Sequence, residues 1–140
     1  MGILSGLHSK ARTMKISDDK KIKDIQQEFR QLFPYLRLRF YKGKHEEGKP
    51  SPPEAQLDPE LSIGEVRQIH NEGELTIQPE MTVGELENLF WTKYGLNVQI
   101  FRRSGNLWLQ TTKTDTWTLA EQNRKGGHSE QAWKEMHGED

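Results

Sequence analysis

The apolar residues of the first half of the chain follow a helical period and then a strand period. Ile22, Ile25 and Phe29 are separated by three or four residues, and Leu32 or Phe33 continues the series, which predicts a helix with one apolar face. The stretch 35–41, YLRLRFY, alternates with a period of two, which predicts a strand. Its leucines and Phe40 are expected to face a core.

The second half of the chain repeats this change of period. Val83, Leu86 and Phe90, with Tyr94 as a possible fourth member, predict a second helix. The stretch 96–103, LNVQIFRR, then alternates as a strand. We expect Val98 and Ile100 to face inward, and the intervening residues to face outward, namely Asn97, Gln99, Phe101 and Arg103.

The similarity of the two halves indicates an internal duplication. An offset of 61 places residues 14–16 beside residues 75–77 and aligns the apolar residues of the first predicted helix with those of the second. After a slip of one residue, Leu36 and Leu38 align with Val98 and Ile100. The sequence therefore predicts two strand-helix-strand units, at about residues 14–71 and 72–124.

Helix starts and turns agree with this division. Three stretches have the form of a capping box, in which a hydroxyl and a glutamate three residues later satisfy backbone N–H groups; they begin at Ser62, Thr82 and Thr118. The last of these is expected to start only a short helix. Residues 104–106 predict a tight turn that joins residues 97–103 and 107–112 as a hairpin. Three of the six prolines lie in residues 45–56, which predicts a loop.

These elements predict an α+β fold in which duplicated strand-helix-strand units pack their helices on one face of a mixed or antiparallel sheet, in a ferredoxin-like or β-grasp-like arrangement. Residues 1–13 are expected to form a flexible arm, residues 14–124 a single domain, and residues 125–140 a flexible tail that begins at a glycine pair. The predicted core comprises Ile16, Ile22, Ile25, Phe29, Leu36, Leu38, Ile77, Val83, Leu86, Phe90, Val98 and Ile100.

Two resemblances concern the second half. The order of elements in residues 75–123, with strand LTI, capped helix TVGELENLFWTKY, hairpin NVQIFRRSGNLWL and late turn TLAEQN, resembles a ubiquitin-like β-grasp. The stretches NVQIFRRSGNLWLQTT and WTLAEQN are similar to a family of short hypothetical proteins from Bacteroides-type bacteria. That family has no assigned activity, so the second resemblance implies no chemistry.

Composition excludes several classes of site. The 140 residues include no cysteine, so disulfides, thiol nucleophiles and cysteine-ligated metals are excluded. No apolar run approaches the ~20 residues of a membrane span, so we expect no membrane partner and a cytoplasmic location. Five histidines are present, but none forms a helical i, i+4 pair, and we expect neither a metal nor a cofactor. His70 is expected to lie at the C-terminal end of a short helix, where the helix dipole favours it.

The sequence offers little support for an enzyme. It holds no phosphate-binding loop and no G-x-S-x-G stretch. The carboxylates of Glu65, Glu85 and Glu121 are assigned to helix caps, and Asp115 to a turn. We expect no carboxylate to stand alone in an apolar stretch, where burial would raise its pKa for acid catalysis. A small enzyme with an unrecognised site therefore stays open only as the third hypothesis.

Uneven charge is the best functional indication. Residues 10–44 carry eleven basic and four acidic residues, whereas residues 45–90 carry two basic and eleven acidic ones. Residues 91–125 are again basic. If the units share one sheet, its outward face combines rings and guanidinium groups. The candidate binding residues on that face are Tyr35, Arg37, Arg39, Tyr41, Phe101, Arg103 and Trp108.

Two functions follow from this face, besides an ordinary solvated surface. The first and favoured one is a non-catalytic module that binds another protein, through the sheet face or through Trp133 and Met136 of the tail. The alternative is a binder of single-stranded nucleic acid, because aromatic rings stack on bases and arginines pair with phosphates.

Overall fold

The computed structural model describes residues 12–44, 46, 48–71 and 73–138. The elements follow in the order β1 (Arg12–Ile16), α2 (Ile22–Leu32), β2 (Leu36–Tyr41), η1 (Pro53–Ala55), α3 (Ile63–Val66), β3 (Gly73–Ile77), α4 (Val83–Tyr94), β4 (Asn97–Ser104), β5 (Leu107–Gln110), η2 (Thr112–Thr114) and α5 (Leu119–His137). The predicted α+β class is therefore confirmed. Residues 1–11 of the expected arm lie outside the described residues, whereas Arg12 and Thr13 belong to β1.

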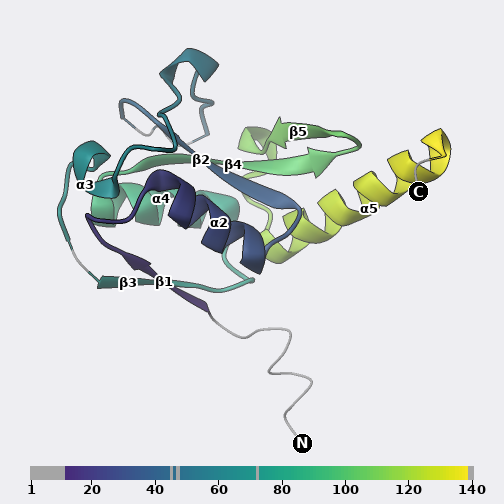
Figure 1. Ribbon diagram of the computed structural model, residues 1–140. Helices are drawn as coiled ribbons and strands as arrows, with labels where there is room; N and C mark the ends of the chain where they lie inside the picture. The colour runs from purple at the N-terminus through teal and green to yellow at the C-terminus, as the bar shows by residue number, and fades with distance from the viewer. Residues whose placement is uncertain (1–11, 45, 47, 72, 139–140) are drawn as a thin grey trace, which may run out of the picture.

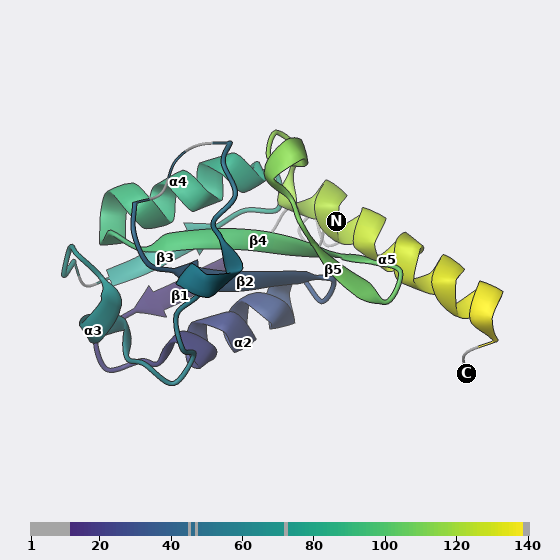
Figure 2. The same ribbon diagram turned by 90° about the horizontal axis from the view of Figure 1, so that it is seen from above.

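The strands form two antiparallel sheets, and each sheet takes strands from both halves of the chain. β1 pairs with β3, while β4 lies between β2 and β5. Figure 1 shows the two sheets as opposite layers, with α2 and α4 drawn at the level between these layers. Turned by 90°, the same ribbon shows these helices on opposite sides of the strands (Figure 2).

The register of both sheets relates residues that the sequence alignment made equivalent. In the first sheet Met14 lies opposite Leu75, and in the second Leu38 lies opposite Ile100. The offsets are 61 and 62, as in the sequence. Each strand pair is thus centred on residues that the sequence alignment matches, and each sheet joins strands of both halves.

The predicted capping boxes are present, and they also connect the helices. The hydroxyls of Ser62, Thr82 and Thr118 each accept from the N–H three residues later. The start of α2 bridges the start of α3 at Lys21 and Ser62, and the start of α4 bridges the start of α5 at Thr82 and Thr118. Each half therefore ties its long helix to the next helix at the N-terminus.

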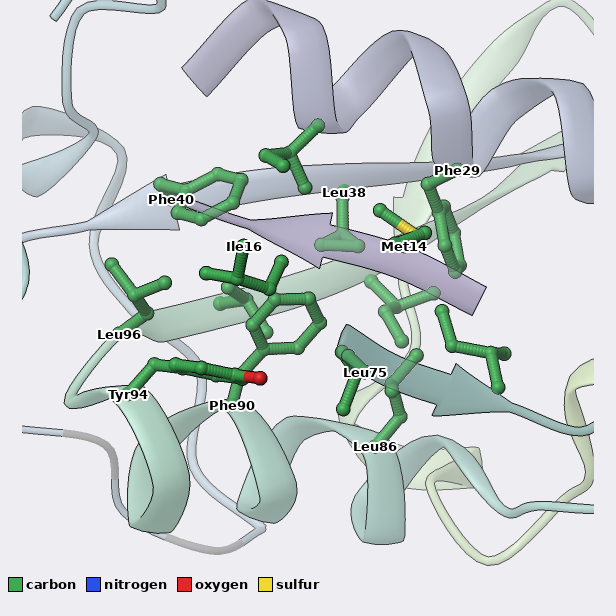
Figure 3. Packing of buried hydrophobic residues seen from close by; sticks show 14 of the residues in the cluster. Met14, Ile16, Phe29, Leu38, Phe40, Leu75, Leu86, Phe90, Tyr94 and Leu96 are labelled. Atoms are coloured by element: carbon green, nitrogen blue, oxygen red, sulfur yellow. The ribbon is translucent and has the colours of Figure 1, made fainter. Parts of the chain in front are cut away.

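One hydrophobic core joins the two halves. All twelve residues predicted for it are buried, and Tyr94, Leu96 and Leu119 extend the same cluster. Figure 3 shows side chains from α2, α4 and the strands of both sheets meeting between the helices. The rings of Phe40 and Phe90 pack edge to face with centroids 6.2 Å apart, which joins a strand of the first half to a helix of the second.

The C-terminal segment differs from its prediction. Instead of a short helix and a flexible tail from residue 125, α5 runs without a break from Leu119 to His137. The glycine pair taken as a break lies inside the helix, where it allows close packing. A Cβ atom at Gly126 would lie 2.9 Å from the Cβ of Tyr35, and one at Gly127 would lie 2.9 Å from its ring.

None of the helices in the described part of the chain is long and apolar enough to cross a lipid bilayer.

Candidate functional site

Part of the predicted basic-aromatic face exists. Across β2 and β4, Arg37 lies opposite Phe101, and across β4 and β5, Arg103 lies opposite Trp108. With Arg39, which follows two residues after Arg37 on β2, these five side chains project from the same face of the sheet. The alternation in the sequence is therefore a sound guide to which residues share this face.

The aromatic rings of this face are already occupied by arginines. The guanidinium carbon of Arg37 lies 4.2 Å from the ring centre of Trp108, and that of Arg39 lies 4.2 Å from the ring centre of Phe101. Arg30 and Arg103 also approach Trp108, at 5.8 and 5.2 Å. Phe101 is only 8 % exposed. The arginines expected beside the rings therefore stack on them, and Phe101 is buried whereas Trp108 is half-buried.

The two tyrosines of the predicted site flank this cluster, one at each end of β2. Tyr41 is buried at the C-terminal end of β2. Burial raises the pKa of its hydroxyl, and the nearby positive charge of Arg39 offsets part of this shift. Tyr35 is half-buried beneath α5, against Gly126 and Gly127. Asn97 and Gln99, expected to face outward, are also buried. Long helices and loops cover both ends of the face, which a strand period cannot reveal.

A groove of about 690 Å³ lies beside the arginines, between α2 and β2. We call it the α2–β2 groove. Its lining residues are Gln26, Gln27 and Arg30 from α2, Arg37, Leu38 and Arg39 from β2, and Gln56 from the loop after η1. Sequence reasoning missed Arg30. The signal was available, because Gln26 and Arg30 are four residues apart and so share the polar side of α2.

The α2–β2 groove carries a local excess of positive charge. Desolvation lowers the pKa of Arg37, and the nearby charges of Arg30, Arg39 and Arg103 lower it further. Arg103 pairs with Glu130 of α5 at 2.9 Å. Among the described residues, no carboxylate forms an ion pair with Arg30, Arg37 or Arg39.

Main-chain atoms form part of the groove wall. The side chain of Leu38 faces the core and the residue is only 2 % exposed, yet Leu38 lines the groove, so its main chain faces that space. The Nε2 of Gln26 donates to the carbonyl oxygen of Leu38 at 2.9 Å. Because β2 is the outer strand of its sheet, this wall is a sheet edge.

A second polar cluster joins Asp18, Arg67 and His70. Arg67 Nε donates to the Asp18 carboxylate at 2.7 Å, and the Nδ1 of His70 lies 3.1 Å from it. These contacts lower the pKa of Asp18, the largest cause being the hydrogen bond with His70. His70 therefore lies beside a carboxylate and outside α3, which ends at Val66, and not at the C-terminal end of that helix as predicted. The buried Arg67 fastens the segment after α3 to the end of β1, which is a structural role.

Glu87 is a buried acid that sequence reasoning missed. It is 4 % exposed, and burial raises its pKa to about 8, with Asp115 adding to the shift. The backbone N–H of Ile100 donates to its Oε2 at 3.1 Å and opposes this shift. The signal was present: Glu87 is four residues after Val83 and three before Phe90, on the apolar side of α4.

Trp133 and Met136, the tail residues proposed for docking, differ from each other in how exposed they are. Trp133 is half-buried, stacks on His137 with ring centres 4.2 Å apart, and lies beside Gly105 in the β4–β5 turn. Ser129, one turn earlier, accepts a hydrogen bond from the N–H of Gly105 at 2.6 Å. Met136 is 82 % exposed. Trp133 therefore fastens α5 to the hairpin.

Comparisons with known proteins give no indication of function, so a functional proposal depends on the geometry of the groove and its arginines. No protein-family model, no curated protein and no solved structure matches the chain. Within the described residues, no three His, Asp or Glu side chains are grouped so that they could hold a metal ion.

Proposed function

We propose that this protein is a non-catalytic interaction module that binds an acidic segment of another protein in the α2–β2 groove. The observation that carries the proposal is the lining of the groove: Arg30, Arg37 and Arg39 face a space of about 690 Å³ without a carboxylate partner in the described chain. Arginine favours carboxylates because its planar group donates two parallel hydrogen bonds to them.

The arginine side chains of the groove are also held in position before a ligand binds. The stacking of Arg37 on Trp108 and of Arg39 on Phe101 restricts the motion of both guanidinium groups before any ligand arrives. Less side-chain entropy is then lost on binding. Gln26, Gln27 and Gln56 add amide groups that can pair with the backbone of a peptide.

A protein partner agrees better with the described surface than single-stranded nucleic acid does. Nucleic-acid stacking needs open ring faces, whereas arginines cover Trp108 and Phe101. The chain has a net charge of −1, and residues 45–90 hold an acidic excess of nine. A long polyanion is repelled by a chain of net negative charge more than a short acidic segment is, because more of its charges lie outside the groove.

We further infer that the two halves are repeats of one strand-helix-strand plan. The pairing of Met14 with Leu75 and of Leu38 with Ile100 supports this, because a twofold relation pairs each central residue with its own equivalent. The matching contacts between helix starts give further support. The hydrogen bonds at a position in one half can then be compared with those at the matched position in the other half.

The proposal is tested by titrating the protein with a capped peptide of alternating Glu and Thr, about eight residues long, at low salt. The variant R30Q/R37Q/R39Q removes the groove cations, and the control K113Q/R124Q/K125Q removes the same charge from exposed sites elsewhere. We expect the first to weaken binding by at least about tenfold and the second by less than about threefold.

Equal weakening by the two variants, or no binding to the unmodified protein, would overturn the proposal. An oligothymidine of similar length is titrated in parallel. If it binds more tightly than the peptide and loses affinity in the groove variant alone, the groove is a nucleic-acid site instead. Circular dichroism checks that each variant is folded.

A further inference from the structure

The outer edges of β2 and β4 differ in which of their main-chain N–H and C=O groups have hydrogen-bond partners. In an antiparallel pair, opposite residues alternate between exchanging hydrogen bonds with each other and directing their N–H and C=O groups outward. The N–H of Arg103 donates to the carbonyl of Tyr35, which places Leu38 and Ile100 in the second class. Leu38 therefore directs both groups away from β4, and Ile100 directs both away from β2.

The chain itself satisfies both groups of Ile100. Its N–H donates to Glu87, and its carbonyl accepts from the N–H of Thr111 at 3.1 Å and from the Thr111 hydroxyl at 2.8 Å. Strand β5 pairs with the following residues of β4, from Phe101 onward. From Ile100 to the end of β4, this edge is therefore closed.

At Leu38 only the carbonyl is satisfied within the described chain. It accepts from Gln26, which occupies the position equivalent to Glu87, but no described group accepts from the N–H of Leu38. Further along β2, Leu57 donates to the carbonyl of Phe40 and Lys42 donates to that of Ala55, so the loop pairs with the end of the strand. The chain then turns away, and the α2–β2 groove occupies the place beside Leu38.

We propose that the acidic partner segment binds as an extended strand added to this edge of β2, with one of its carbonyls accepting the N–H of Leu38. This inference rests on the proposed function. Alternate residues of a strand lie on the same face, ~6.5–7 Å apart, which is also the spacing of Arg37 and Arg39. An acidic residue at every second position would therefore place successive carboxylates beside the two guanidinium groups.

The test uses the peptide of alternating Glu and Thr and two analogues, N-methylated at every Glu or at every Thr. In an extended strand the N–H groups of these two residue types point to opposite edges. We expect one analogue to lose at least about tenfold in affinity and the other to bind within about threefold of the parent. Equal affinities, or equal losses, would overturn strand addition.

Hydrogen exchange of the Leu38 amide gives an independent readout. We expect the parent peptide to slow it by at least about tenfold, while the amide of Ile100 is unchanged. If the parent peptide binds and depends on the groove arginines, but Leu38 gains no protection, the proposed function stands and strand addition fails. If the parent peptide does not bind at all, the proposed function itself fails.

Discussion

The sheet edges at Leu38 and at Ile100, two residues that the sequence alignment matches, have different surroundings in the two halves of the molecule. Both place a strand beside a long helix, and both bring a side chain of that helix to the central residue of the strand, Gln26 to Leu38 and Glu87 to Ile100. In the second half the chain returns at once and covers the edge. In the first half the edge stays accessible beside three arginines.

The connection that follows each strand accounts for the difference. After β4, a tight turn with Gly105 in the left-handed region, φ 62°, directs the chain back as β5. After β2, the chain enters the proline-containing loop and returns only as the single bridge between Tyr41 and Gln56. An edge strand keeps unpaired main-chain groups where the connection that follows it is too irregular to pair along its whole length.

Of the substitutions that compare the two halves, those that shorten a side chain of the shared core should lower the free energy of unfolding most. Phe29 and Phe90, which the sequence alignment matches, are both fully buried. Replacing either with Ala should lower the free energy of unfolding by ~3–5 kcal/mol. Phe29→Leu and Phe90→Leu are milder versions if the alanine variants do not fold.

Because one cluster joins both halves, each variant should still unfold in a single transition by fluorescence and by circular dichroism. Separate transitions for the two halves would show that the core is not shared.

Glu87 should give the second half a pH dependence. The ordinary glutamate of the unfolded chain titrates near 4.5, whereas burial raises the native pKa of Glu87 to about 8. Between these values the native state holds the extra proton, so stability falls as pH rises, by up to ~1.4 kcal/mol per pH unit.

Urea unfolding from pH 5 to 8 measures this slope, and Glu87→Gln should flatten it. Glu80→Gln, at an exposed position before α4, serves as the control. A slope that Glu87→Gln leaves intact would assign the titration to another group.

The helix caps should show the smallest difference. Thr82 accepts from the N–H of Glu85 at 3.1 Å, whereas Lys21 begins α2 without a side-chain cap bond. Thr82→Ala should cost about 1 kcal/mol of stability, and Lys21→Thr should add a few tenths to about 1 kcal/mol. Thermal unfolding compares the two. A loss of stability in Lys21→Thr would mean that its contact with Glu60 outweighs the missing cap.

The sequence predicts the elements and core of this fold because both depend on local periods. Ile22, Phe29 and their equivalents repeat at helical spacing, and that spacing is enough to bury them. It does not predict α5, because a glycine pair usually ends a helix, and only the approach of Tyr35 explains Gly126 inside one.

The site is predicted less completely because it combines separate elements. Alternation places Arg37 and Arg39 on one face, but it cannot show that their stacking partners are Trp108 and Phe101. Arg30 joins them only after α2 packs beside β2. The empty edge at Leu38 depends on where the chain returns, and no local period records that.

Hydrogen exchange of the unliganded protein tests the difference between the two edges most directly. The amide of Leu38 has no acceptor in the described chain, whereas that of Ile100 donates to the buried Glu87 at 3.1 Å. We predict that Leu38 exchanges at least about tenfold faster than Ile100, after correction for intrinsic rates. Equal or slower exchange at Leu38 would mean that this edge of β2 is closed, and would contradict the account.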